Sequence, residues 1–137
     1  MAELHDDLRI AVMRLARRVR LERAADDITD ARLSVLFVLL GGGPQTLTSL
    51  SEHERVTPPS MNRTVNSLVD DGLAVRTPDP DDKRKMIIDI TDAGQDVALE
   101  TRRRRVAWFA DHVAELGDDE RSVLEAALPI LRRLADS

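Results

Sequence analysis

The sequence predicts a mainly helical protein whose centre is a winged helix-turn-helix with a two-stranded β wing, flanked by helices at both ends of the chain. Two short helical segments meet at the tight turn Arg55–Val56, which predicts the helix-turn-helix. Directly after Gly72 the apolar spacing changes from helical to alternating around a turn rich in proline and aspartate, which predicts the wing. Amphipathic periodicity across both chain ends predicts the flanking helices.

Length and composition are typical of a single domain. The chain has 137 residues, of which 42% are hydrophobic, and one domain commonly has about 150 residues. It has no cysteine, which excludes disulfides, thiolate metal sites and thiol nucleophiles. No apolar run approaches the ~18 residues of a membrane span, and no signal-peptide pattern opens the chain. We therefore expect a soluble, cytoplasmic protein with no membrane partner.

The N-terminal segment 4–25 is predicted to be a helix with two apolar faces. One face contains six residues at helical spacing: Leu4, Leu8, Ala11, Val12, Leu15 and Val19. A second apolar line on the opposite side contains Ile10, Met13 and Leu21, with Arg17 between them. Such a helix has more surface to bury than one small domain needs, so we expect it to pack against a partner helix in an oligomer.

The next segment predicts the central helix of the core. The run Leu33–Leu40 is nearly all apolar. Thr29 is a suitable N-cap before it, and Gly41–Pro44 is typical of a helix end.

Two short helices are expected to form the helix-turn-helix. The first covers 46–54, where Ser49 and Glu52 have the spacing of a capping box. The second covers 58–71, because Thr57 followed by proline is typical of a helix start.

A hairpin and two further helices are predicted to complete the chain. Strands are expected over 74–77 and 85–90, joined by the turn at 78–82. Thr91 is a suitable cap for a long helix that reaches about residue 116. A break at Gly117 then precedes a final helix with one apolar face.

No motif for catalysis, metal binding or cofactor binding stands out. The three histidines, His5, His53 and His112, have no second strong ligand at metal-binding spacing. The sequence contains neither a dinucleotide fingerprint nor a serine-nucleophile motif, and Gly41–Gly43 lacks the Lys-Ser/Thr of a phosphate loop. We therefore expect neither an enzyme nor a metal or cofactor site.

The second helix of the helix-turn-helix is the expected reader of double-stranded DNA. In this motif the N-terminal residues of that helix approach base edges in the major groove. The candidate contacts there are Thr57, Pro59, Ser60, Asn62 and Arg63. Asparagine can pair with adenine and arginine with guanine, although such residues can also simply keep a helix soluble. DNA binding is favoured because the wing follows at the right distance and carries Asp82, Lys83 and Arg84.

Positive charge is expected to be local. The net charge of −5 argues against a broadly basic nucleic-acid binder, and two Phe and one Trp cannot form a stacking platform for single-stranded bases. The run Arg102–Arg105 points in four directions on a helix, so phosphate contact and simple solvation both stay open for it.

Several stretches of the chain resemble the MarR family of bacterial transcriptional regulators. They are Val56–Val65, Leu68–Arg76, Pro80–Arg84 and Ile90–Gly94. The most specific mark is a D-x-R wing motif, here Asp82–Arg84, followed by T-x-x-G at Thr91–Gly94. The helix order matches over nearly the whole chain. Two departures are Ser51, where many members have a small apolar residue, and Arg55 at a glycine-like turn position.

The resemblance implies an intertwined homodimer on a palindromic operator. Residues 1–27 and 92–137 would form the dimerisation region, and 28–91 the DNA-binding lobe. By the same resemblance Arg84 would enter the minor groove with Asp82 orienting it. Repression would be relieved by a small phenolic or anionic molecule bound between the dimerisation helices and the lobe.

We accordingly expect a ligand-responsive repressor. Arg17 and Trp108 are the candidate ligand contacts: Arg17 either pairs with a carboxylate across the dimer or binds an anionic molecule, and Trp108, beside Phe109, can stack on an aromatic ring. The alternative is a winged-helix protein-interaction module without DNA binding. The acidic wing turn, with Asp79, Asp81 and Asp82, keeps that alternative open.

Overall fold

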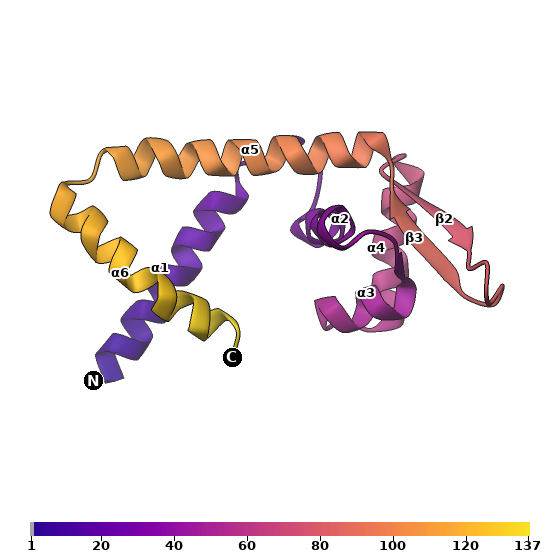
Figure 1. Cartoon of the computed structure of the whole chain (residues 1–137), viewed down its shortest axis with the longest axis horizontal. Helices are drawn as coiled ribbons and strands as arrows, with labels where there is room; N and C mark the ends of the chain where they lie inside the picture. Colours follow the sequence, from indigo (N-terminus) through magenta and orange to yellow (C-terminus); the bar gives the residue numbers. More distant parts are fainter. Residues whose placement is uncertain (1) are drawn as a thin grey trace.

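The computed structural model describes residues 2–137, and within them six helices accompany a three-stranded antiparallel sheet. The helices are α1 (Ala2–Arg20), α2 (Asp30–Gly42), α3 (Leu47–Glu54), α4 (Pro58–Asp70), α5 (Asp92–Ala114) and α6 (Asp118–Ala135). The strands are β1 (Gln45–Thr46), β2 (Ala74–Pro78) and β3 (Met86–Ile90). The long helix α5 begins at the lobe formed by α2 to β3, α1 meets it near its middle, and its other end leads into α6 (Figure 1).

The hydrophobic core lies in the lobe. Its buried apolar side chains come from the segment just before α2, from α2, α3 and α4, from the sheet and from the first half of α5: Ile28, Leu33, Val35, Leu36, Leu39, Leu50, Met61, Val65, Leu68, Ala74, Ile88 and Ala98. In contrast, α6 and residues 3–20 of α1 contribute no buried side chain. The lobe therefore has its own core, while the two terminal helices leave their apolar faces exposed.

The predicted two-stranded wing is confirmed, and a third strand that was not predicted extends its sheet. Strands β2 and β3 form the expected hairpin, with Ala74 opposite Ile90. The additional strand β1 pairs with the other edge of β3, and Gln45 lies opposite Ile88. A two-residue strand is too short to show an alternating pattern in the sequence, so only the tertiary pairing reveals it.

Three predicted threonine caps are confirmed. The Oγ1 atoms of Thr29, Thr57 and Thr91 each accept a hydrogen bond from a backbone N–H in the first turn of the helix that follows. The predicted capping box at Ser49 is wrong. Thr46 caps α3 instead, and its Oγ1 accepts from the Ser49 N–H at 3.1 Å. Thr46 and Ser49, three positions apart, are both suitable caps, and the start of the helix at Leu47 makes Thr46 the cap.

The first helix is shorter than predicted, since it ends at Arg20, and a connector over 21–29 crosses onto α5. Thr101 Oγ1 accepts from the Ala24 N–H at 3.0 Å. Two arginines of α5 donate to connector carbonyls, Arg104 to Arg23 at 2.8 Å and Arg105 to Glu22 at 3.1 Å. These two members of the basic run therefore hold the connector against the middle of α5.

Candidate nucleic-acid interface

The turn between α3 and α4 has a backbone conformation that L side chains rarely adopt. Arg55 lies in the left-handed region at φ 55° and ψ 44°, which is why a glycine-like residue is favoured there. The Val56 N–H donates to the Ser51 carbonyl at 3.1 Å and closes the turn. Ser51 is buried, and its hydroxyl donates to the Leu47 carbonyl at 2.9 Å. Both departures from the family pattern are thus accommodated.

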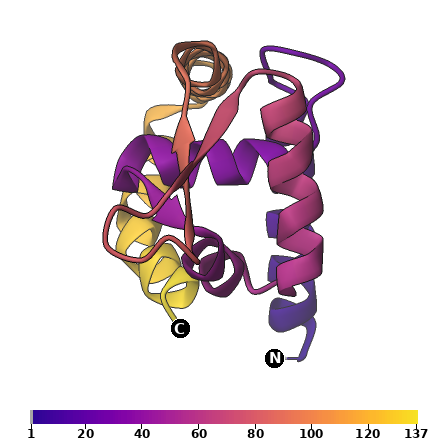
Figure 2. The same ribbon diagram turned by 90° about the vertical axis from the view of Figure 1, so that its right-hand side faces the viewer.

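Helix α4 stands along the outer side of the lobe (Figure 2), and one of its faces is polar and exposed. Met61, Val65 and Leu68 face the core. The opposite face, at helical spacing, exposes Pro59, Arg63, Asn66 and Asp70. Predicted contacts Pro59 and Arg63 therefore point outward. Asn66 was missed by the sequence reasoning, which considered only the first turns of the helix.

Asn62 lies at the edge of this face and is bonded to the wing. Its side-chain oxygen Oδ1 accepts a hydrogen bond from Arg76 Nη2 of β2 at 2.9 Å. Arg76 was also missed, although alternation along β2 offers a signal, because Arg76 shares a face with the buried Ala74. Thr57 is an exposed cap, and Ser60 is partly exposed in the first turn.

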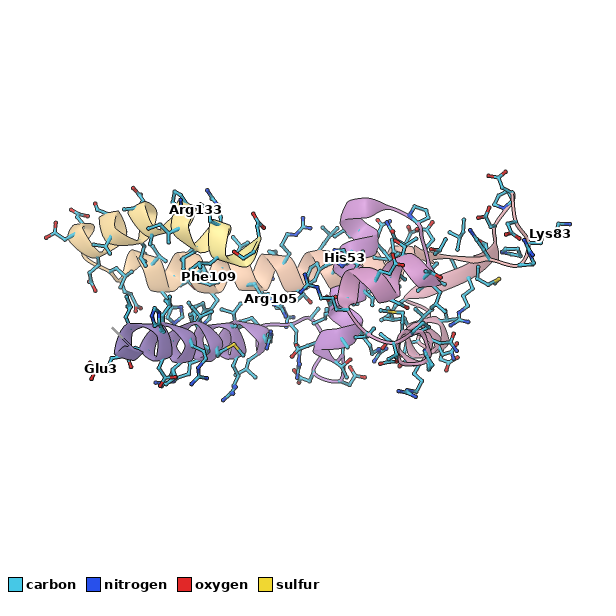
Figure 3. All side chains as sticks on the ribbon, turned by 90° about the horizontal axis from the view of Figure 1, so that it is seen from below. Glu3, His53, Lys83, Arg105, Phe109 and Arg133 are labelled. Atoms are coloured by element: carbon cyan, nitrogen blue, oxygen red, sulfur yellow. The ribbon has the colours of Figure 1, made fainter. Side chains whose placement is uncertain are left out.

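The wing holds an exposed arginine on an acidic anchor. Asp82 Oδ1 accepts from the backbone N–H of Arg84 and from its Nε, both at 3.1 Å. These hydrogen bonds lower the pKa of the Asp82 carboxyl below its ordinary value, so it stays ionised. The Arg84 side chain nevertheless remains 91% exposed. Lys83 extends from the tip of the hairpin (Figure 3).

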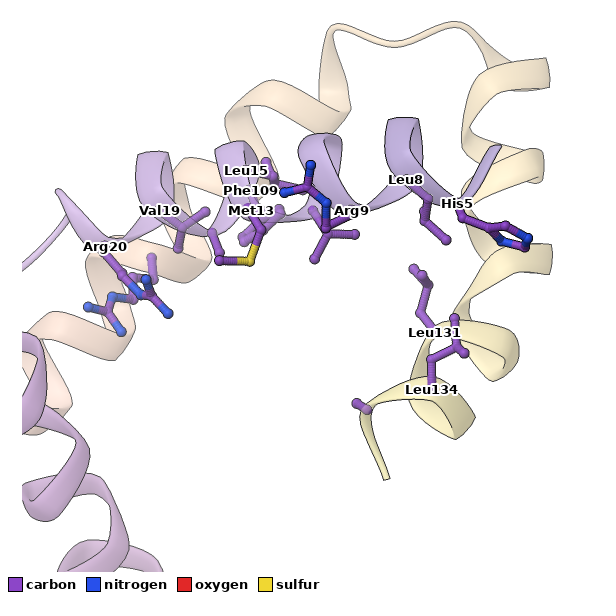
Figure 4. Close-up of a pocket in the computed structure, with 14 residues that line it drawn as sticks. His5, Leu8, Arg9, Met13, Leu15, Val19, Arg20, Phe109, Leu131 and Leu134 are labelled. Atoms are coloured by element: carbon purple, nitrogen blue, oxygen red, sulfur yellow. The ribbon is translucent and has the colours of Figure 1, made fainter. Parts of the chain in front are cut away.

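Two cavities lie beside α1. The larger, about 770 Å³, is mostly apolar, and residues of α1, α5 and α6 line it, among them Leu8, Phe109 and Leu131 (Figure 4). The smaller, about 360 Å³, lies between the end of α1, α2 and α5. Arg20 and Arg105 line both cavities.

The two predicted ligand contacts line neither cavity. Arg17 is exposed on α1. Trp108 is partly buried, where its ring stacks on His112 and the Arg18 guanidinium lies 5.1 Å from its ring centroid. In the smaller cavity, burial lowers the pKa of Arg105, and Asp30 partly opposes that effect.

Two further features, a helix able to span a membrane and a metal-ligating cluster, are absent from residues 2–137. In this range no helix has the length and apolarity needed to cross a membrane. The same residues contain no cluster of three or more histidine and carboxylate side chains that could hold a metal ion.

Three features together define a winged helix-turn-helix protein. They are a capped helix that faces outward, a tight turn before it with one left-handed residue, and an arginine on the adjoining hairpin that is bonded to an aspartate. Residues 26–85 match the model of the MarR family. An HTH-type transcriptional regulator of Mycobacterium tuberculosis is 36% identical over 135 residues, which cover 98% of this chain and 94% of the relative. The chain belongs to the MarR family of DNA-binding transcriptional regulators.

Solved structures agree with this assignment. A transcriptional regulator protein from Pseudomonas aeruginosa is 30% identical, with a TM-score of 0.87, over 99% of this chain and 96% of that one. The FabT protein of Streptococcus pneumoniae, solved in complex with DNA, shares the fold with a TM-score of 0.78 at 16% identity, over 99% and 98% of the two chains. The family and relatives are transcriptional regulators rather than enzymes, and they favour DNA binding over the protein-interaction alternative.

Proposed function

We propose that this chain is a cytoplasmic transcriptional repressor that binds a palindromic operator as a homodimer and is released by a small anionic aromatic molecule. The observation that carries the proposal is the combination of two features in one lobe. The outward face of α4 presents Arg63, and the wing presents the anchored Arg84. A helix in the major groove and an arginine in a neighbouring minor groove form a consistent DNA-binding pair.

The proposal assigns each candidate residue a role. Arg63 and the Asn62 side chain approach base edges, Thr57, Ser60 and Lys83 contact phosphates and set the register, and the apolar ring of Pro59 makes van der Waals contact. Arg84 enters the minor groove, and Asp82 restricts its direction.

Homodimerisation is supported by the apolar side chains left exposed on the terminal helices. They include Leu4, Leu8, Val12, Met13 and Leu15 of α1, and Val123, Leu124, Leu128, Ile130, Leu131 and Leu134 of α6. Exposed apolar area this continuous is typical of a surface that another chain covers. A second copy would supply the same helices and place two lobes on one duplex.

Effector binding is supported by the smaller cavity, since it lies between α1 and the lobe. Arg20 and Arg105 outnumber the one carboxylate of its lining, Asp30, so the cavity has a net positive charge, and Phe37 gives it an aromatic wall. An anionic aromatic molecule matches that lining. A ligand that binds better to one lobe spacing shifts the dimer away from the spacing that fits the operator.

A mobility shift on the promoter next to the gene tests DNA binding and release together. We expect the wild-type protein to retard this duplex and salicylate to release it. Failure to retard that promoter, together with no enrichment from a random duplex library, would contradict the repressor proposal.

Calorimetry with salicylate locates the effector site. Arg20→Ala should weaken binding, because Arg20 lines the cavity, whereas the matched control Arg17→Ala on the same helix should not. The opposite result would assign the contact to Arg17, as the sequence suggested. Absence of both binding and DNA release with any such compound would contradict the effector class.

A further inference from the structure

Asn62 differs from the other candidate contacts of α4 because its side chain is bonded to a strand of the wing. Arg76 Nη2 donates to Asn62 Oδ1 at 2.9 Å and lies 3.4 Å from the Asn62 backbone carbonyl oxygen. Both residues are partly buried between α4 and β2. Arg76 Nε is also buried, and it has no hydrogen-bond partner among the described residues. The guanidinium therefore lies between the two elements and not in solvent.

The chemistry of arginine fixes how the Asn62 amide is oriented. A guanidinium has five N–H donors and no acceptor, so the amide oxygen must face Arg76. The reverse orientation would place the Asn62 NH₂ group against another donor. The NH₂ group of Asn62 is therefore the part of the amide left for DNA.

That orientation changes which base Asn62 can recognise. Pairing with adenine needs the amide oxygen and NH₂ on the same base edge, since the oxygen accepts from N6 and the NH₂ donates to N7. The bond to Arg76 turns the Asn62 oxygen towards the wing instead. A lone donor fits a base edge rich in acceptors, which in the major groove is guanine with N7 and O6.

We propose that Arg76 is a positioning residue that fixes Asn62 as a hydrogen-bond donor, so that Asn62 selects guanine. Asn66, one helical turn further along and exposed, forms no side-chain hydrogen bond within residues 3–137. It is the asparagine of α4 that keeps both amide groups free for adenine. This inference rests on the proposed function, because it requires α4 to enter the major groove.

Selection of duplexes from a random library by the full-length protein tests the inference. We compare wild type with Arg76→Met, Arg76→Lys, Asn62→Ala and Asn66→Ala. Asn62→Ala should reduce the preference for guanine at one position about tenfold, the size expected for one lost base contact. Arg76→Met should shift the preference at that same position towards adenine, because the Asn62 oxygen is released.

The remaining variants serve as controls. Arg76→Lys should keep the wild-type base preference, since lysine also donates to the amide oxygen. Asn66→Ala should lose an adenine preference at a different position. Thermal melting of every variant separates a change in base preference from loss of the fold. An Arg76→Met protein that melts lower but keeps the wild-type preference at every position would show a purely structural tie and overturn the inference.

The side-chain amide resonances of Asn62, assigned by their absence in Asn62→Ala, provide a readout without DNA. Their chemical shifts should change in Arg76→Met and stay near the wild-type values in Arg76→Lys. Unmoved resonances in Arg76→Met would overturn the inference even if the protein binds DNA. Resonances that move as expected, in a protein that enriches no duplex, would contradict the proposed function and the base selection with it.

Discussion

At the residue scale, the proposed role of the Asp82–Arg84 ion pair lies in DNA binding rather than in folding. The carboxylate accepts three hydrogen bonds from one residue only two positions away, so the loop conformation is set locally. An exposed pair of this kind contributes little to the stability of the fold. Its effect is to restrict the direction of a side chain that remains 91% exposed.

Arg84→Ala should weaken operator binding roughly tenfold and reduce the dependence of the affinity on salt, because one cation in contact with DNA is lost. Asp82→Ala should weaken binding less, since the arginine remains but samples more directions. Titration of both variants at several salt concentrations, with melting curves as a control for folding, measures these effects. Wild-type affinity in both variants would show that the wing does not bind as proposed.

Arg55→Gly should stabilise the protein relative to Arg55→Ala by about 1 kcal/mol, because only glycine adopts the left-handed conformation without steric cost. Both variants remove the same charge, so their difference isolates the backbone. Urea unfolding measures it. Equal stability of the two variants would mean that the turn relaxes out of the left-handed region.

Residue identity predicted the local contacts and missed the distant ones. Thr57 and the Asp82–Arg84 pair depend on neighbours in sequence, and the structure shows them as a cap and an ion pair. The contact between Arg76 and Asn62 joins residues 14 positions apart. It depends on how β2 packs against α4, which no local pattern specifies. The position of Arg17 outside both cavities likewise follows from how α1 lies against α5.

At the element scale, α5 connects the lobe to the terminal helices. Its start is fixed by Thr91, whose hydroxyl donates to the Gly72 carbonyl at 2.7 Å. Gly94, in the first turn, packs so closely that an added Cβ would lie 2.2 Å from the Leu73 carbonyl oxygen. Further along, Thr101 and two arginines hold the connector from α1. These bonds make α5 the physical link between the connector that follows α1 and the lobe.

Gly94→Ala should destabilise the protein by about 2–3 kcal/mol, because the methyl group would force backbone atoms apart. Gly41→Ala is the matched control. It lies inside α2 with nothing within 4 Å of the added atom, so the change should stabilise the helix by about 0.5–1 kcal/mol. Urea unfolding of both variants measures the change in the free energy of unfolding. An unchanged free energy in Gly94→Ala would contradict the close packing.

Glu100→Gln should lower the melting temperature slightly at pH 7 and leave it unchanged near pH 2. Hydrogen bonds from Arg103 and Arg104 lower the pKa of Glu100 from 4.5 to about 2. A pKa that is lower in the folded state stabilises the fold at pH values above the unfolded-state pKa of 4.5. That stabilisation is lost as the pH falls from there through about 2. Melting curves from pH 2 to pH 7 measure the difference, and a difference that does not depend on pH would rule out this origin.

Elements with strong boundary residues were predictable, and elements defined by pairing were not. The hairpin follows alternation, and α2, α4 and α5 follow their threonine caps. Strand β1 is defined by its pairing with the edge of β3 that β2 leaves open. The end of α1 at Arg20 also depends on tertiary structure, since the hydrogen bonds to α5 draw the following residues out of the helix.

At the scale of the whole molecule, residues 3–137 contain one buried core and one large exposed apolar region. The core belongs to the lobe, and the exposed region belongs to α1 and α6, beyond the lobe along α5 (Figure 1). The doubly apolar first helix indicated this excess from sequence alone. A partner that covers α1 and α6 would bury that surface and also set the spacing between two lobes.

The mass of the complex between the full-length protein and its operator tests this arrangement most directly. We use the duplex enriched from a random library by the wild-type protein and measure the complex by native mass spectrometry. A homodimer with one lobe on each half of a palindrome predicts two chains per duplex, and two chains in the free protein at low micromolar concentration. One chain per duplex, or a free monomer at that concentration, would contradict the proposed assembly.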